Sequence, residues 1–384
     1  MNFPKLHRVV FLLAFMLTAL CCHADSNQPK TKDGDASKME TPIIYQQKKF
    51  RLPKPISSIF SVPLKSTVGT NDLVNAISLI HFDGEKADIR HLLDDFVENV
   101  GGGTLSFLPP VSSSTIGYAQ SRRFILIDLK EKSFHQFLVC KRLEENINRV
   151  AIADASKLMF LFEILAFSDD PTDTSDPDRI LRMVDLSSGS DTVIAERKLS
   201  AHAGWTTHQG TTLLFDENGV LALDKGLNPT HHPFASLYAE ARGDFSEQIR
   251  ITELLVHPEL PFGVVIGTGS KEPGKRYVVW LAAWKEGEKP VIVPMIAENR
   301  SFIYKDFEFS PDGTFLLMKV QERQQTEFIV SPVDPASPLF LGKPVSLGSS
   351  EAHFSIAWIE APLSLAVLEN QAIRVWDLTA PVSQ

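Results

Sequence analysis

Cysteine is scarce in this chain. Its 384 residues contain three cysteines, and two of them, Cys21 and Cys22, fall within the first 24 residues. Cys140 is then left alone, which excludes an internal disulfide framework for the rest of the chain. Its apolar surroundings in the stretch FHQFLVC indicate a small buried hydrophobe rather than a reactive thiol.

An excess of basic residues is also lacking, because the formal net charge is −9. No basic stripe interrupts this acidic balance, so a nucleic-acid partner is disfavoured. Long apolar runs are missing beyond the first 24 residues, and no later segment is a transmembrane candidate. With 43% hydrophobic residues the chain is still far too apolar to be disordered as a whole.

Residues 1–24 have the pattern of a secretory signal peptide. Lys5 and Arg8 precede an apolar stretch at 9–20, and small residues precede a cleavage site after Ala24. Twelve helical residues span about 18 Å, too short for the roughly 30 Å hydrocarbon core, so a membrane anchor is disfavoured. Lipid attachment at Cys21 or Cys22 is disfavoured because the large Leu20 precedes the first of them. We therefore expect export, to a periplasm or the medium, and a bacterial envelope fits a large exported domain without disulfides.

After a polar leader at 25–40, which we expect to be flexible, residues 41–384 have one uniform texture. Short apolar runs alternate with turn residues, which predicts a single all-β domain. The best helical candidates are short, at 89–97 and 235–242. An extended β array or two packed sandwiches remain alternatives to a ring of sheets.

One unit recurs, an aliphatic run closed by Asp and followed by a polar turn. From Asp83 to Asp377 it spans six steps of about 49 residues, and each is long enough for a four-stranded blade. The prediction is a seven-bladed β-propeller. The recurrences are centred on Asp83, Asp128, Asp185, Asp224, Asp334 and Asp377, and RYVVWLAAW fills the same place without the Asp.

The last unit offers three strands and then the chain stops, whereas residues 42–52 form a strand without a blade of its own. Pairing this strand with the last blade would close the ring and hide two strand edges that otherwise favour aggregation. We therefore predict closure by the amino-terminal strand.

Two short segments of the chain resemble motifs of known families. The FSPDG turn at 309–313 and the VWDL ending at 375–378 look like the turns and strand ends of WD-repeat propellers and of the propeller in TolB-type envelope proteins. The resemblance covers 42–384 as a loose blade pattern. It implies the fold and a tendency to bind other proteins.

An acidic loop, SDDPTDTSDPD at 168–178, is a candidate calcium site, because Ca²⁺ prefers several oxygen ligands at short spacing. It lacks the Gly and distal Glu of an EF-hand loop, so a plain solvated loop is the alternative. The candidate ligands are Asp169, Asp170, Asp173, Asp176 and Asp178.

Candidate binding residues are His202, Trp205 and His208, which fall on a loop and an inner strand, and Trp284, which we expect to be exposed. Inner strands line the centre of a propeller, so His208 could face it. Hydrolase elbows, phosphate loops, dinucleotide fingerprints and zinc-peptidase spacings are all absent from the sequence.

Two functions therefore remain. The first is a non-catalytic exported propeller that binds an envelope protein or other ligand through its rim or channel. The second is a hydrolase or lyase acting on a sugar, lactone or peptide in the channel through His202, His208 and Asp216. No cofactor other than calcium is indicated.

Overall fold

The computed structural model describes most of the chain between residues 44 and 382. The predicted signal segment 1–24, the leader 25–40 and the helical candidate 235–242 lie outside the described residues. The described ranges are 44–53, 56, 58–71, 76–84, 86–93, 106–108, 111–170, 175–200, 203–208, 211–216, 219–230, 249–269, 276–283, 291–294, 302–322, 324–351, 354–369 and 371–382.

Over these residues the chain is nearly all β, as its pattern predicts. Strands account for 28 elements, and the short 3₁₀ turn η1 (Ala155–Lys157) is the helical one given in the described ranges. None of the described helical segments is long and apolar enough to cross a membrane. The helical candidate at 89–97 is wrong where it can be checked, because residues 89–93 belong to a strand.

The described strands form seven four-stranded antiparallel sheets, which we number in chain order. Sheet 1 contains β2 (Ser58–Ser61), β3 (Thr67–Asn71), β4 (Ile77–Asp83) and β5 (Lys86–Leu93). Sheet 2 contains β6 (Ser106–Phe107), β7 (Thr115–Gln120), β8 (Arg123–Asp128) and β9 (Ser133–Leu138). Sheet 3 contains β10 (Glu145–Asp154), β11 (Met159–Ala166), β12 (Asp178–Asp185) and β13 (Thr192–Leu199).

The next three sheets repeat this order. Sheet 4 contains β14 (Gly204–His208), β15 (Thr211–Asp216), β16 (Gly219–Leu223) and β17 (Pro229–Thr230). Sheet 5 contains β18 (Ile249–Val256), β19 (Phe262–Gly269), β20 (Arg276–Ala283) and β21 (Val291–Pro294). Sheet 6 contains β22 (Phe302–Phe309), β23 (Phe315–Glu322), β24 (Gln325–Pro332) and β25 (Val345–Glu351).

Sheet 7 combines both ends of the described chain. Its order is β26 (Phe354–Glu360), β27 (Leu363–Glu369), β28 (Ala372–Val382) and then β1 (Ile44–Arg51). β1 is antiparallel to β28, with Arg51 opposite Ala372 and Ile44 opposite Val382. This is the position that the sequence predicts for the leading strand.

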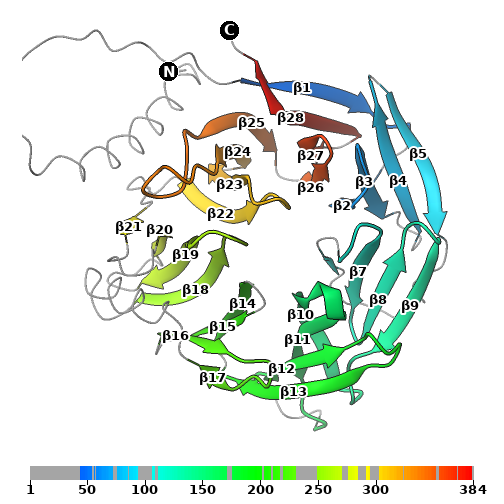
Figure 1. The fold of residues 1–384 in the computed structure, drawn as a ribbon, viewed down its shortest axis with the longest axis vertical. Helices are drawn as coiled ribbons and strands as arrows, with labels where there is room; N and C mark the ends of the chain where they lie inside the picture. Colours follow the sequence, from blue (N-terminus) through cyan, green and yellow to red (C-terminus); the bar gives the residue numbers. More distant parts are fainter. Residues whose placement is uncertain are drawn as a thin grey trace, which may run out of the picture.

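Figure 1 shows the sheets arranged around a centre, with β10, β14, β18, β22 and β26 nearest to it and β1 beside β28. Apolar clusters lie between neighbouring sheets rather than in one central core. Sheets 2 and 3, for example, share Phe124, Phe160 and Phe162, with ring centroids of Phe124 and Phe160 4.8 Å apart. Sheets 7 and 1 share Ile59, Ala366 and Ile373. Each sheet therefore depends on its neighbours for burial of its apolar faces.

Five of the recurring Asp residues share one local hydrogen-bond pattern. The Oδ1 atom of Asp128 accepts hydrogen bonds from the backbone N–H groups of Lys130 and Glu131 at 2.8 and 2.9 Å. Such a side chain fixes the turn that leads to the outer strand. The same bond to the residue two positions on is formed by Asp185, Asp224, Asp334 and Asp377.

The predicted SPDG turn joins β22 to β23. Ser310 Oγ accepts from Phe315 N at 2.9 Å, and Gly313 has a φ of +71° that favours glycine. His257 of sheet 5 reaches across to this turn, with Nε2 2.8 Å from the Gly313 carbonyl oxygen. The turn therefore also links two neighbouring sheets.

Candidate functional site

Three inner strands share one irregularity at an equivalent place. The register of β10 against β11 shifts between Ile147 and Arg149, and corresponding shifts precede Glu253 in β18 and Asp306 in β22. A bulge leaves one residue unpaired and re-aims the side chains that follow it. Each of the three bulges is followed directly by a charged residue.

We call the charged residues at this place the inner-ring cluster. Besides the three residues that follow the bulges, it includes Glu308 of β22 and Lys319 of β23, which lies opposite Asp306. The cluster thus holds three carboxylates and two cations, on elements of sheets 3, 5 and 6. Its members are Arg149, Glu253, Asp306, Glu308 and Lys319.

Arg149 is held against Trp205 of sheet 4. Its guanidinium carbon lies 4.8 Å from the centroid of the indole ring, and Nη1 donates to the Trp205 carbonyl oxygen at 2.9 Å. Burial lowers the pKa of Arg149, although Glu253 and Glu163 act in the opposite direction. The contact fixes the cation against β14 of sheet 4.

Trp205 is anchored in turn by the buried Glu163 of β11. Trp205 Nε1 donates to Glu163 Oε2 at 2.8 Å, and the other carboxylate oxygen accepts from Asn148 Nδ2 at 3.0 Å and from Arg179 Nε at 2.8 Å. A carboxylate this buried is stable when all its lone pairs have donors. Trp205 and Arg149 therefore rest on a rigid support.

In sheet 6, Lys319 lies between two carboxylates. Its Nζ atom is 2.7 Å from Asp306 Oδ2 and 3.5 Å from Glu308 Oε2. Trp358 of sheet 7 donates its Nε1–H to Glu308 Oε1 at 2.9 Å. Burial, with a smaller effect of Asp306, raises the pKa of Glu308, while its side chain keeps 43% of its surface accessible. The Glu308 carboxylate therefore remains partly accessible to solvent.

Glu253 differs from the other members, because no hydrogen bond or ion pair joins its carboxylate to the described residues around it. Burial and then the Asp306 carboxylate raise its pKa, and Arg149 and Lys319 act against them. Both of those cations already have closer partners. The site therefore offers one carboxylate whose charge nothing in the described part of the chain balances by direct contact.

The predicted binding residues are only partly brought together. Trp205 contributes to the cluster through Arg149, whereas His208 is buried at the other end of β14. Residues three apart on a strand lie on opposite faces, so these two side chains do not face the same space. His202 and Trp284 lie outside the described residues, and the side chain of Asp216 is not described.

The acidic loop is a surface feature between β11 and β12. Asp169, Asp170, Asp176 and Asp178 are exposed, and Asp173 lies outside the described residues. Asp178 pairs with Lys198 at 2.7 Å. No group of three or more His, Cys, Asp or Glu in the described ranges has a geometry that would hold a metal ion. Calcium binding by this loop stays a prediction.

Sequence reasoning did not find the inner-ring cluster. The positions depend on bulges, and one residue of register reverses every side chain along a strand. The available signal was the alternation of charge in KDFEF at 305–309, an inner-strand segment with acids on alternate positions.

Comparison with known proteins identifies the architecture. No protein-family model matches the chain. No curated protein matches it either. Among solved structures, the β-propeller domain of Myceliophteria thermophila Cps50 (Swd1) superposes with a TM-score of 0.51 at 12% identity, over 85% of this chain and 99% of that one. The chain adopts a β-propeller fold.

A second similar structure is that of an enzyme. Oligogalacturonate lyase from Vibrio parahaemolyticus superposes with a TM-score of 0.55 at 12% identity, over 88% of this chain and 98% of that chain. Identities this low carry the fold and no activity. The predicted resemblance to β-propellers is confirmed, and the function has to be argued from the site.

Proposed function

We propose that this chain is an exported, non-catalytic propeller that binds a partner protein and receives a cationic side chain of that partner at the inner-ring cluster. In this proposal the seven sheets are seven blades, closed into a ring by the pairing of β1 with β28. The signal pattern at 1–24 supports export.

The observation that carries the binding proposal is the state of Glu253. Its carboxylate lies near Asp306 and lacks a direct partner within the described residues, while both cations of the cluster are engaged elsewhere. A Lys or Arg side chain from a partner would supply the missing charge. Because binding favours the ionised carboxylate, the affinity should fall as pH drops through the raised pKa of Glu253.

The charge of the cluster also bears on the enzyme alternative. An oligogalacturonate is a chain of sugar acids, and three carboxylates against two cations would repel such a polyanion. The sequence carries no hydrolase motif that would support a different bond cleavage. Action on a sugar, lactone or peptide stays a prediction, and a turnover assay with such substrates tests it separately from partner binding.

The test is affinity capture from an extract of the producing cells, with quantitative mass spectrometry. The baits are the wild type, Glu253→Lys, and the control Glu131→Lys, which makes the same charge reversal on an exposed turn of sheet 2. We expect a protein that wild type and control recover and that Glu253→Lys loses by about tenfold or more.

Two results would contradict the proposal. One is equal recovery of every protein by all three baits. The other is turnover of a sugar, lactone or peptide by the wild type at a rate that depends on the cluster residues.

A further inference from the structure

The outer edge of sheet 2 is formed by β9, which pairs with β8 on one side and has no strand of the described chain on the other. Figure 1 shows β9 at the circumference of the molecule. An outer strand presents backbone N–H and C=O groups that can pair with a strand of another chain. Proteins usually protect such edges with charged residues, prolines, bulges or short strands.

Five of the described outer strands carry protection of this kind. β5 and β13 each contain three residues that are Lys, Arg, Asp or Glu. β17 and β21 have two and four residues, and each contains a proline. β25 has Glu351 at its end, and its register against β24 shifts next to Gly348.

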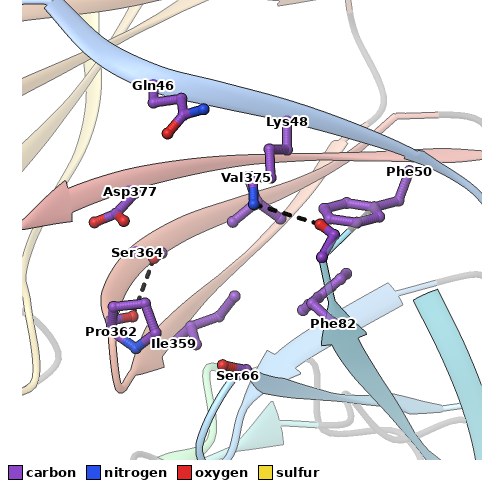
Figure 2. A pocket seen from close by; sticks show the side chains of 11 residues that line it. Gln46, Lys48, Phe50, Ser66, Phe82, Ile359, Pro362, Ser364, Val375 and Asp377 are labelled. Carbon is purple, nitrogen blue, oxygen red and sulfur yellow. Dashed lines mark hydrogen bonds between the residues drawn. The ribbon is translucent and has the colours of Figure 1, made fainter. Parts of the chain in front are cut away.

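The outer strand of sheet 7, β1, is protected by cations. It carries Lys48, Lys49 and Arg51. Figure 2 shows Lys48 beside a cleft of about 190 Å³ between sheets 7 and 1, where its Nζ donates to the Gly84 carbonyl oxygen at 3.4 Å. A strand added to β1 would have to desolvate these charges, so this edge resists pairing.

β9 has none of these devices. Its sequence SFHQFL contains no Lys, Arg, Asp, Glu or Pro, and its register against β8 is regular over all six residues. Phe134 and Leu138 keep 38% and 53% of their surface accessible. The strand is therefore a regular, uncharged edge with apolar side chains in solvent, which is the kind of edge that pairs with another strand.

The exposed residues of β9 are arranged symmetrically about Gln136. Phe134, Gln136 and Leu138 alternate along the strand and lie on one face, whereas Phe137 is buried on the other face between sheets 2 and 3. When two copies of β9 run antiparallel with Gln136 opposite itself, Phe134 of each copy lies opposite Leu138 of the other. The exposed apolar groups then cover each other, and two four-stranded sheets join edge to edge.

This symmetry and the charge of the chain favour a second copy as the occupant of the edge. With a net charge of −9, two copies repel each other wherever acidic surfaces meet, but β9 brings no charged residue into the contact. A contact in which both copies use the same strand also closes after two copies and does not continue into a fibre.

We propose that this protein forms a two-fold symmetric dimer by antiparallel pairing of β9 with β9 of a second copy, centred on Gln136. The contact lies on the outside of the molecule and contains no residue of the inner-ring cluster. It therefore goes beyond the proposed partner binding and can fail separately from it.

Sedimentation velocity of the purified protein between about 1 μM and 1 mM measures the oligomeric state. We expect a reversible monomer–dimer equilibrium in this range. Leu138→Lys should weaken the dimer by about tenfold or more, because it places a cation against the apolar Phe134 of the other copy twice in the symmetric contact. Ile194→Lys is the matched control, since Ile194 is a similarly exposed apolar residue on the outer strand β13. It should stay within about twofold of wild type.

Cross-linking tests the register of the two strands. Because Gln136 lies opposite itself, Gln136→Cys should form a disulfide-linked dimer under mild oxidation. His135→Cys is the matched control, because its two copies would be diagonal neighbours about 7–8 Å apart, beyond the usual reach of a disulfide. We expect about fivefold less linked dimer from this control, with wild type as the background. Thermal midpoints verify that all variants fold.

A protein that stays monomeric at every concentration would overturn the proposal. A dimer that Leu138→Lys leaves intact, or that Ile194→Lys weakens equally, would overturn it as well. Equal cross-linking of Gln136→Cys and His135→Cys would contradict the pairing about Gln136. Glu253→Lys should leave the dimer unchanged, so failure of the dimer and failure of the inner-ring proposal are distinguishable.

Discussion

His257 is a buried residue that holds two sheets together. Its Nε2–H donates to the Gly313 carbonyl oxygen at 2.8 Å, while Nδ1 accepts from the backbone N–H groups of Glu259 and Leu260 at 3.0 and 2.8 Å. The ring also stacks on Phe262, with centroids 5.0 Å apart. All three hydrogen bonds need the neutral imidazole, which fixes its tautomer.

Acid should therefore destabilise the fold through this residue. Burial lowers the pKa of His257 below its ordinary value of 6.5, against smaller opposing effects of Gly313 and Glu259. Below that value the unfolded chain binds a proton that the folded chain does not, so the free energy of unfolding falls as pH drops through this range. At pH values above 6.5 the neutral His257 contributes fully to the stability of the fold.

Replacing His257 by Ala should lower the free energy of unfolding by about 2 kcal/mol at pH 7.5, because one buried and two part-buried backbone groups lose their partners. Urea unfolding at pH 7.5 and pH 5.5 measures this. The loss between the two pH values should be smaller in the variant than in the wild type. If the variant and the wild type lose the same free energy of unfolding between pH 7.5 and pH 5.5, groups other than His257 cause the pH dependence.

Cys140 should behave as a structural residue. It is fully buried, and burial, followed by Glu145, raises its pKa to about 12 against Arg182 and Arg122. We expect the native protein to resist iodoacetamide at pH 8 and the denatured protein to react at once. Mass spectrometry counts the labels: one if export removes Cys21 and Cys22, three if it does not. Rapid labelling of the native protein would contradict the burial.

At the scale of elements, the repeat that predicted the fold has a physical cause. Asp128, Asp185 and Asp224 recur because the turn after the third strand of their sheets uses a side-chain acceptor for backbone N–H groups. The periodicity was readable from sequence because this requirement is local. It does not depend on which face of a strand packs on which neighbour.

Asp128 allows this role to be tested. Asp128→Ala removes the acceptor for two N–H groups and should lower stability by about 0.5–1.5 kcal/mol, whereas Asp128→Asn keeps an acceptor oxygen and should lose less. Thermal or urea unfolding measures both. Equal losses in the two variants would point to the charge rather than to the turn.

Other elements were beyond sequence reasoning. The segment 89–93 has a helical spacing of apolar residues but forms the outer strand β5, because pairing with β4 overrides local preference. The bulges that place Arg149, Glu253 and Asp306 likewise leave no clear local signature. Pairing between strands decides both features, so neither could be predicted from local sequence. The fold could be predicted because its turn signals are local.

At the scale of the molecule, the described sheets bury their apolar residues in clusters between neighbours rather than in a common core. Because the apolar clusters lie between neighbours, the faces of sheets 1 and 7 also need each other, and Ile59 and Ile373 meet there. Strands from both ends of the described chain thus contribute to sheet 7, which packs against sheet 1. The proposed closed ring therefore depends on the pairing of β1 with β28.

That pairing is tested most directly by cross-linking. The double variants Arg51→Cys with Ala372→Cys and Lys48→Cys with Val375→Cys join two register pairs of β1 and β28. Successive antiparallel pairs alternate between hydrogen-bonded and open geometry, so pairs three positions apart sample both kinds. We predict that at least one forms an intramolecular disulfide and, by closing a very long loop, raises the stability by about 4 kcal/mol. If both remain reduced under oxidation, or link only separate molecules, the closed ring is wrong.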